Sequence, residues 1–247
     1  MSDISSTTTR FAPGWAMTAF VAFFLPALIA LGFWQLDRGE EKRQMQAQMD
    51  ASRSALAVSV QTLQNAEDRA WRPLQIRGVF DPEHIWLLDN RTRNGQAGLE
   101  VLQRFKDTDS DLELVVNRGW LAWPDRREAP RVVTPEGIQR LDAEALPEAK
   151  TGFTLGDTNA QSGWPKLITG VDLKAMNAAS SQSLLPWMAR LRTGSDAALT
   201  LDWPALPITS SKHVAYAVQW FALALALLAL FVWAGFRPES PENETNA

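Results

Sequence analysis

The sequence predicts a membrane protein of the α+β class, in which two transmembrane helices flank one extramembrane domain built on an antiparallel β-sheet meander with a few short helices. Three observations predict this fold. Val214–Phe236 contains 23 residues without a formal charge, and Trp15–Trp34 contains 20. From Trp71 onward, apolar residues recur with the period of two that is typical of strands. We expect flexible tails at 1–14 and 237–247, transmembrane helices at 15–35 and 213–236, and one domain at 36–212.

The first expected helix begins after a Ser/Thr-rich tail, Met1–Arg10. Trp15–Trp34 has tryptophan at both ends, and 20 residues at about 1.5 Å each match a hydrocarbon core of about 30 Å. A secretory signal peptide fits less well, because the apolar run is long and Gly32–Gln35 stands where a small-residue cleavage site is needed. We therefore expect a retained span that tolerates Pro26 and continues as a helix through the polar stretch 37–60.

The middle segment begins with signals for four strands joined by tight turns. In the first of them Leu74, Ile76 and Phe80 face one way, while Gln75 and Arg77 face the other. Asn94-Gly95 is a strong hairpin signal, and 106–111 forms a second turn. The strands are expected at Trp71–Phe80, Ile85–Leu88, Leu99–Phe105 and Leu112–Val116. This pattern predicts an antiparallel meander.

Beyond Trp123 the signals are weaker. Pro124–Pro135 is charged and proline-rich, which predicts a surface loop. Thr134–Leu146 is expected to form a helix with Thr134 as N-cap, and Asp172–Ala179 another, capped by Asp172. Leu184–Leu191 is expected to form a strand in which Pro186 requires an edge or a bulge.

Composition excludes several classes of protein. A formal charge of −4 gives no electrostatic footprint for nucleic acid. The chain lacks cysteine, so it has no disulfide, thiolate nucleophile or zinc knuckle. Its two histidines, His84 and His213, are far apart, and the signatures of hydrolase elbows, phosphate loops, zinc proteases and dinucleotide sites are missing. We expect a protein that is not an enzyme, with a membrane-anchored hydrolase as a distant alternative.

The start of the second apolar run carries an unusual group of polar and aromatic residues. His213, Tyr216 and Trp220 are spaced i, i+3 and i+7, so they share one helix face, and Gln219 lies at a similar depth. Tyrosine and tryptophan here are equally explained as interfacial anchors. A histidine at this position faces protein, water or a ligand more often than lipid, although an interfacial imidazole without a partner is the alternative.

Five motifs in one order resemble a known family. Gly32–Arg38 resembles its G-x-W-Q-x-x-R signature, and Arg77–Asp81 and Leu88–Arg91 resemble two of its strands. Val116–Trp120 is similar to its V-N-R-G-W motif, and His213–Phe221 to its second-span signature. The family is the surfeit-locus-one type of cytochrome c oxidase assembly factor. The resemblance covers both spans and Trp71–Trp123, while the lead-in Ser210–Lys212 and the region 124–204 depart from the pattern.

The resemblance implies a bacterial inner-membrane protein that assists haem a insertion into a haem-copper oxidase or stabilises its catalytic subunit during maturation. Both termini would then be cytoplasmic and the middle domain periplasmic, an orientation that the few tail charges do not settle. It implies haem a as a transient cofactor, with His213 as the candidate ligand of the haem iron. Implied partners are the catalytic subunit of cytochrome c oxidase, proteins of haem a synthesis or delivery, and membrane lipid, with no nucleic acid.

The resemblance also nominates the residues around that ligand. If the two spans pack side by side, His213 would share its depth with further cofactor-binding candidates: Trp34, Gln35, Tyr216, Gln219 and Trp220. Helix packing and interfacial anchoring explain these residues equally well. Arg38 and Arg118 are candidates for haem propionates, or else ordinary ion-pair residues. Two functional alternatives stay open: a structural oxidase-associated protein without haem contact, and a periplasmic sensor, which would need a partner for its output because only 237–247 follow the second span.

Overall fold

The computed structural model describes residues 11–147, 163–181, 183–192, 194–203 and 210–236. Residues 1–10 and 237–247 of the expected tails lie outside the described residues, and so do residues 204–209. The chain divides into two compact units. One comprises residues 1–46 and 206–247, and the other comprises residues 47–205.

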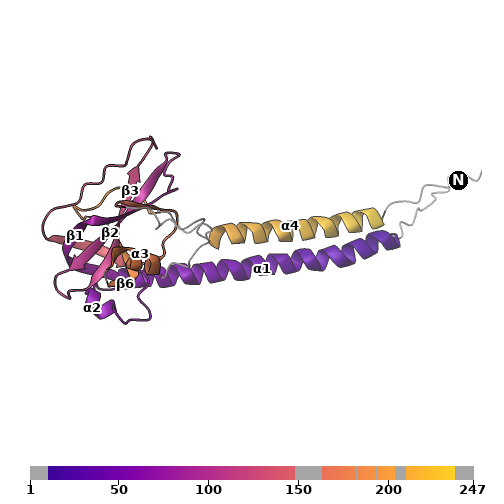
Figure 1. Ribbon diagram of the computed structural model, residues 1–247. Helices are drawn as coiled ribbons and strands as arrows, with labels where there is room; N and C mark the ends of the chain where they lie inside the picture. Colours follow the sequence, from indigo (N-terminus) through magenta and orange to yellow (C-terminus); the bar gives the residue numbers. More distant parts are fainter. Residues whose placement is uncertain (1–10, 148–162, 182, 193, 204–209, 237–247) are drawn as a thin grey trace, which may run out of the picture. The chain divides into compact units, whose positions relative to one another are not determined.

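Two helices dominate the first unit. Helix α1 spans Trp15–Ser54 and α4 spans Ser210–Gly235 (Figure 1). Both are long and apolar enough to cross a membrane, as predicted, and α1 continues through the polar stretch to Ser54 with Pro26 inside the helix. Only 11% of the apolar window of each helix is buried within the structure. Such an exposed apolar surface indicates a membrane environment, because soluble monomers rarely leave patches of this extent uncovered.

Small residues bring α1 and α4 together. A side chain at Gly32 would meet the Phe221 ring, and one at Gly39 would lie 3.4 Å from Cβ of His213. Ala217 and Ala224 on α4 are also buried. Small residues allow membrane helices to approach closely, and that approach replaces the hydrophobic driving force that lipid does not supply.

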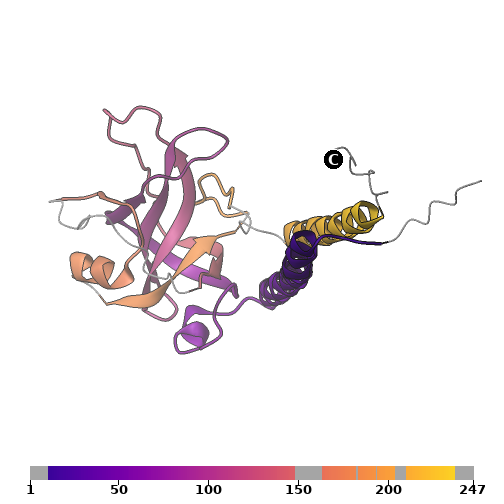
Figure 2. The ribbon, with the colours of Figure 1, turned by 90° about the vertical axis from the view of Figure 1, so that its right-hand side faces the viewer.

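The second unit is a β domain of six strands with two short helices. Its elements, in chain order, are α2 Val60–Leu63, β1 Pro73–Leu88, β2 Gly98–Asp107, β3 Glu113–Ala122, β4 Gln139–Ala145, β5 Lys166–Ile168, α3 Leu173–Ser180 and β6 Leu184–Leu191. Strands β1, β2 and β3 form the predicted antiparallel meander. Strand β6 pairs with β3 in parallel and with β4 in antiparallel orientation, and β4 pairs with β1. Because β1 also pairs with β2, the five strands β1, β2, β3, β6 and β4 close into a barrel. Figure 2 shows these strands curving around a common interior.

The structure corrects the prediction of a purely antiparallel sheet. The β3–β6 and β1–β5 pairs are parallel, so the sheet is mixed. Long-range pairing of this kind leaves no local turn signal in the sequence, whereas the hairpin at Asn94-Gly95 does. Both of those turn residues have positive φ, and Arg93 bridges to Gln96 as a tight hairpin requires.

Two strands predicted as separate are one. Strand β1 runs through both, and the ladder with β2 shifts register between Phe80 and Ile85, so the residues 81–84 lie opposite Arg104. Pro82 lacks the N–H that a regular ladder needs there, and a bulge absorbs the interruption. The predicted alternation in the first half is confirmed: Leu74, Ile76 and Phe80 are buried, whereas Gln75 and Arg77 are exposed.

The helix predicted at Thr134–Leu146 is wrong, because Gln139–Ala145 forms strand β4. Its residues are good helix formers, but Leu141, Ala143 and Ala145 are buried at the period of two that the pairing with β1 imposes. Tertiary packing thus overrides local propensity. Gly137, with φ of +72°, lies just before the strand.

Other local predictions are confirmed. Residues 124–135 contain no helix or strand. Helix α3 begins at Leu173 with Asp172 as its N-cap, accepting from the N–H groups of Lys174 and Ala175. Strand β6 matches its predicted bounds, and the β3–β6 register shifts across Pro186, which is the predicted bulge.

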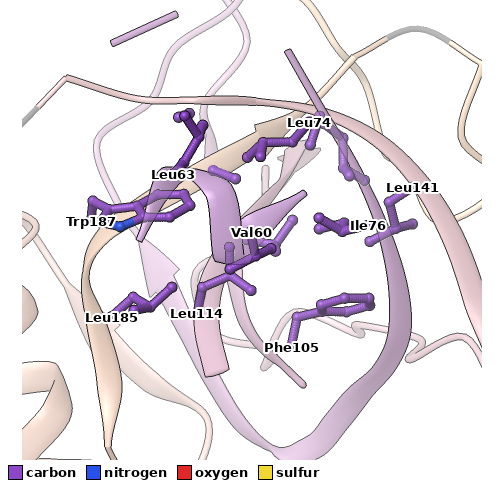
Figure 3. Packing of buried hydrophobic residues seen from close by; sticks show 14 of the residues in the cluster. Val60, Leu63, Leu74, Ile76, Phe105, Leu114, Leu141, Leu185 and Trp187 are labelled. Carbon is purple, nitrogen blue, oxygen red and sulfur yellow. The ribbon is translucent and has the colours of Figure 1, made fainter. Parts of the chain in front are cut away.

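The core of the β domain fills the interior of the ring. Figure 3 shows Val60 and Leu63 of α2 packed with Trp187, Leu114 and other residues of the surrounding strands. Helix α2 therefore covers an opening of the barrel with apolar side chains. A second cluster, around Trp86 and Met188, lies on the side where α3 and β5 pack.

Candidate functional site

The helix pair carries one polar contact in the middle of the predicted site. Nδ1 of His213 on α4 lies 2.8 Å from Oε1 of Gln35 on α1. An amide oxygen only accepts hydrogen bonds, so Nδ1 carries the proton and donates it. In the neutral imidazole, Nε2 then keeps its lone pair, the state that a metal ligand needs.

The sequence places these two groups against each other through the small residues of α1. Gln35 lies between Gly32 and Gly39 on the same helix face, and Gly39 packs beside the Cβ of His213. Phe221 fills the space beside Gly32 and makes an edge contact with Phe33 at 5.3 Å between ring centroids. The imidazole is therefore held by Gln35, its Cβ lies close to Gly39, and the residue is half-buried.

The structure separates the other candidates from this contact. Trp220 is half-buried, next to the face that packs on α1. Trp34 is 52% exposed, Tyr216 is 50% exposed, and Gln219 is also exposed. These three exposed residues lie on the outer surfaces of the helices, where a ligand, lipid or a partner protein can reach them.

Sequence reasoning nominated Gln35 as part of a cofactor wall and did not foresee its hydrogen bond to His213. It also missed Gly39 and Phe221 as the residues that shape the contact. The available signal was the spacing of Gly32 and Gly39, seven residues apart on one face of an apolar helix.

The two arginine candidates have different surroundings. Arg38 forms an ion pair with Glu41 on the surface of α1, the alternative that the sequence left open. Arg118 is buried and donates to the carbonyls of Ala197 and Val133 and to the amide oxygen of Gln103. Burial lowers the pKa of Arg118 to about 10. All three of these acceptors are neutral, so the predicted ion pair is not what fixes this side chain.

The remaining family-like motifs build the β domain. Asn117 donates to Glu100 and accepts from the N–H of Gly119, which has a φ of +114°. The indole of Trp120 donates to the carbonyl of Arg91. It lies against Gly98 and occupies the space that a side chain at that position would need. These contacts account for the residues structurally and leave the helix pair as the better candidate site.

His84, the second histidine, belongs to a charged cluster in the β1 bulge. Its Nδ1 lies 2.7 Å from Oδ2 of Asp81, which also accepts from Arg104, and Arg104 pairs with Glu113. Burial alone would raise the pKa of Asp81, but hydrogen bonds from the Glu83 N–H and His84, and the charges of His84 and Arg104, hold it below its usual value. No group of three His, Asp or Glu side chains in the described part of the chain is placed to hold a metal ion.

The fold and the site define a class of protein: a β domain whose chain enters and leaves through two membrane-compatible helices that meet at a His–Gln contact. Comparison with known proteins then shows the family. The model of the SURF1 family matches residues 22–225, which include both helices and the β domain. The chain belongs to the SURF1 family.

Members of this family are similar to the chain over most of their own length. A SURF1-like protein of Rickettsia conorii is 26% identical over 86% of this chain and 88% of its own. A SURF1-like protein of Monosiga brevicollis is 25% identical over 82% of this chain and 81% of its own. Surfeit locus protein 1 of Xenopus tropicalis is 23% identical over 84% of this chain and 71% of its own.

Proposed function

We propose that this protein assists the maturation of a haem-copper oxidase by holding haem a transiently at His213 before the catalytic subunit receives it. Proteins of the SURF1 family are known as oxidase assembly factors. The observation that carries the haem step is the His213–Gln35 hydrogen bond, because it sets the imidazole tautomer and leaves Nε2 able to bind iron.

The residues fit the group that the family implies. His213 would hold haem through one imidazole nitrogen, and bound haem would supply the iron that this nitrogen binds. Gln35 orients His213 and fixes its proton on Nδ1. Trp220, Trp34 and Tyr216 offer aromatic faces to a macrocycle, and Gln219 offers an exposed amide. Their exposure suits transient binding, since a carrier must release its cargo.

No catalytic group is needed for this role, and we propose that the protein is not an enzyme. Its partners would be the catalytic subunit of the oxidase, proteins that make or deliver haem a, and membrane lipid. We further propose a bacterial inner-membrane location with the β domain in the periplasm and both termini in the cytoplasm. Reporter fusions at either end of the chain test that orientation, and a periplasmic signal from both fusions would overturn it.

The test of haem binding is the optical spectrum of the detergent-purified protein from cells that make haem a. We expect a haem signal in the wild type and a sharp loss in His213→Ala. His84→Ala is the matched control, because His84 is the second of the two histidines and lies in the β domain. Equal haem content in all three proteins, or none in the wild type, would overturn the proposal.

A structural role without haem contact is the second candidate. The same His213–Gln35 contact favours it, because a hydrogen bond between two spans also stabilises a helix pair. This role predicts that the wild type copurifies with oxidase subunits without haem, and that His213→Asn, which still offers a hydrogen-bond donor, preserves assembly. Loss of assembly in His213→Asn at normal protein levels would exclude it.

A further inference from the structure

A groove on the β domain has no part in the proposed haem step. It encloses about 560 Å³, which falls within the range of ligand sites. Strands β1 and β4 form it together with the turn after β2 and the loop after β6. The lining residues are Gln75, Ile76, Arg77, Asp109, Arg140, Leu141, Asp142 and Gly194.

Two arginines lie directly opposite each other in this groove. Arg77 on β1 and Arg140 on β4 are register partners in the antiparallel ladder. Side chains at such positions start about 5 Å apart, and like charges there destabilise the sheet. Both residues are exposed, and no packing of the core requires a guanidinium at either position.

Two carboxylates, Asp109 and Asp142, also line the groove, and neither forms a hydrogen bond with Arg77 or Arg140 in the described part of the chain. Asp109 lies 3.7 Å from Nη1 of Arg77, and Asp142 lies 3.8 Å from Arg192. Arg140 has no side-chain partner among the residues that the structure describes. Elsewhere in the same domain, arginines sit at hydrogen-bonding distance from their carboxylates: 2.8 Å for Arg93 with Glu100, and 2.6 Å for Arg190 with Glu144.

We propose that Arg77 and Arg140, the register partners on β1 and β4, together bind a phosphate group. Each guanidinium group carries parallel N–H donors that match phosphate oxygens bidentately, and the ladder register places two such groups at opposite positions of β1 and β4 in the same groove. Gln75 lies two residues before Arg77 on the same face of β1. Its side-chain amide can donate or accept a hydrogen bond in the groove. A bound phosphate would offset the repulsion between the two guanidinium groups, because each of them would make a charge-assisted contact with it. The source is a free phosphate ester or the headgroup of a phospholipid.

Titration calorimetry of the full chain in a neutral detergent tests the site, with inorganic phosphate and then pyrophosphate at constant ionic strength. We expect saturable binding to the wild type and a loss of about tenfold or more in Arg77→Gln and in Arg140→Gln, since each variant removes a charge-assisted contact. Arg127→Gln is the matched control, because it removes an exposed arginine that pairs with Asp125 outside the groove. Equal binding in all four proteins, or no binding to the wild type, would overturn the proposal.

A second pair of probes identifies the source. Glycerol phosphate and a short-chain phosphatidylglycerol, used below its micellar concentration, present the same phosphate without and with acyl chains. Equal affinities that both fall in Arg140→Gln support a free phosphate ester. Tighter binding of the lipid that also falls in Arg140→Gln supports a headgroup. Tighter lipid binding that Arg140→Gln leaves unchanged assigns it to the apolar helices and counts against the groove.

Discussion

The helix pair and the β domain use polar groups in opposite ways. In the helix pair, His213 and Gln35 form a side-chain hydrogen bond between α1 and α4, within a contact lined by glycine, alanine and phenylalanine. The β domain instead buries a dense set of ion pairs. Glu144 alone binds Arg53 and Arg190, whose guanidinium groups stack on Trp71.

This difference shows where to look for function. In the β domain, buried charged groups such as Arg118 and Glu144 are hydrogen-bonded or ion-paired. A family-like residue such as Asn117 or Trp120 has a structural explanation of the same kind. Apolar helices can pack without any polar side chain. A histidine and a glutamine retained there call for a reason beyond packing, and the proposed haem step supplies one.

The largest effect is expected from Glu144→Ala. The substitution leaves the buried guanidinium of Arg190 without its carboxylate, and breaking a buried pair in this way costs about 3–5 kcal/mol. Hydrogen-exchange protection of the β strands should fall accordingly. The control is Glu41→Ala, which breaks an exposed pair with Arg38 on α1 and should change stability by less than about 0.5 kcal/mol. Similar effects of both substitutions would remove the contrast between the regions.

Two glycine substitutions compare the regions directly. A Cβ at Gly78 would collide with the backbone carbonyl of Lys106, which cannot move without breaking the β1–β2 ladder, so we expect Gly78→Ala to cost about 3 kcal/mol or more. A Cβ at Gly32 would meet the far end of the Phe221 ring, which can rotate, so Gly32→Ala should cost about 1–2 kcal/mol. Gly14→Ala, with open space around it, is the control. Hydrogen-exchange measurements on each region should show a larger loss of stability for Gly78→Ala than for Gly32→Ala. The reverse order would contradict the packing described here.

Acid should loosen the β domain before the helix pair. The pKa of Asp89 is lowered: burial opposes the shift, but Arg126 and the Asn90 N–H outweigh it. A depressed carboxyl pKa contributes stability that is present above the unfolded value of about 3.9 and is lost as pH falls through the folded value. The same holds for Asp81. In the helix pair, α4 contains no carboxylate, and the ion pairs of α1, such as Glu40 with Arg43, are exposed and contribute little to stability.

The test is the stability of the β domain as a function of pH in the wild type and in Asp89→Asn. The variant is expected to be less stable at pH 7, and the gap should narrow below about pH 4 as Asp89 becomes protonated in the wild type. A gap that stays constant down to pH 2 would show that Asp89 is not an ionised partner of Arg126.

The sequence predicted what local patterns encode. Apolar runs predicted both long helices, and period-two alternation with Asn94-Gly95 predicted the meander. Asp172 predicted the N-cap of α3, and Pro186 the bulge in β6. The closure of the barrel could not be predicted in this way, because β4 is made of helix-forming residues that become a strand only through pairing with β1 and β6.

The candidate site was only partly predictable for a similar reason. The spacing of His213, Tyr216 and Trp220 predicted a shared helix face, but it does not say which residue meets the other helix. The structure turns His213 toward Gln35 and leaves Tyr216 exposed. That choice depends on the close approach at Gly32 and Gly39, which is a property of the pair of helices and not of either segment alone.

The smallest expected effect on stability comes from Gln35→Leu. Hydrogen bonds between membrane helices contribute about 0.6 kcal/mol on average, so the helix pair should remain folded. Without the amide oxygen, the imidazole of His213 loses the acceptor that fixes its proton on Nδ1. Loss of such a supporting contact typically weakens a metal site by about 10–100-fold. We therefore expect haem retention during purification to fall sharply while helix content stays unchanged. Gln48→Leu removes an exposed amide from a part of α1 outside the proposed site and is the matched control for a loss of polarity on the helix. Normal haem retention in Gln35→Leu would show that the contact serves helix packing alone and would favour the structural role of His213.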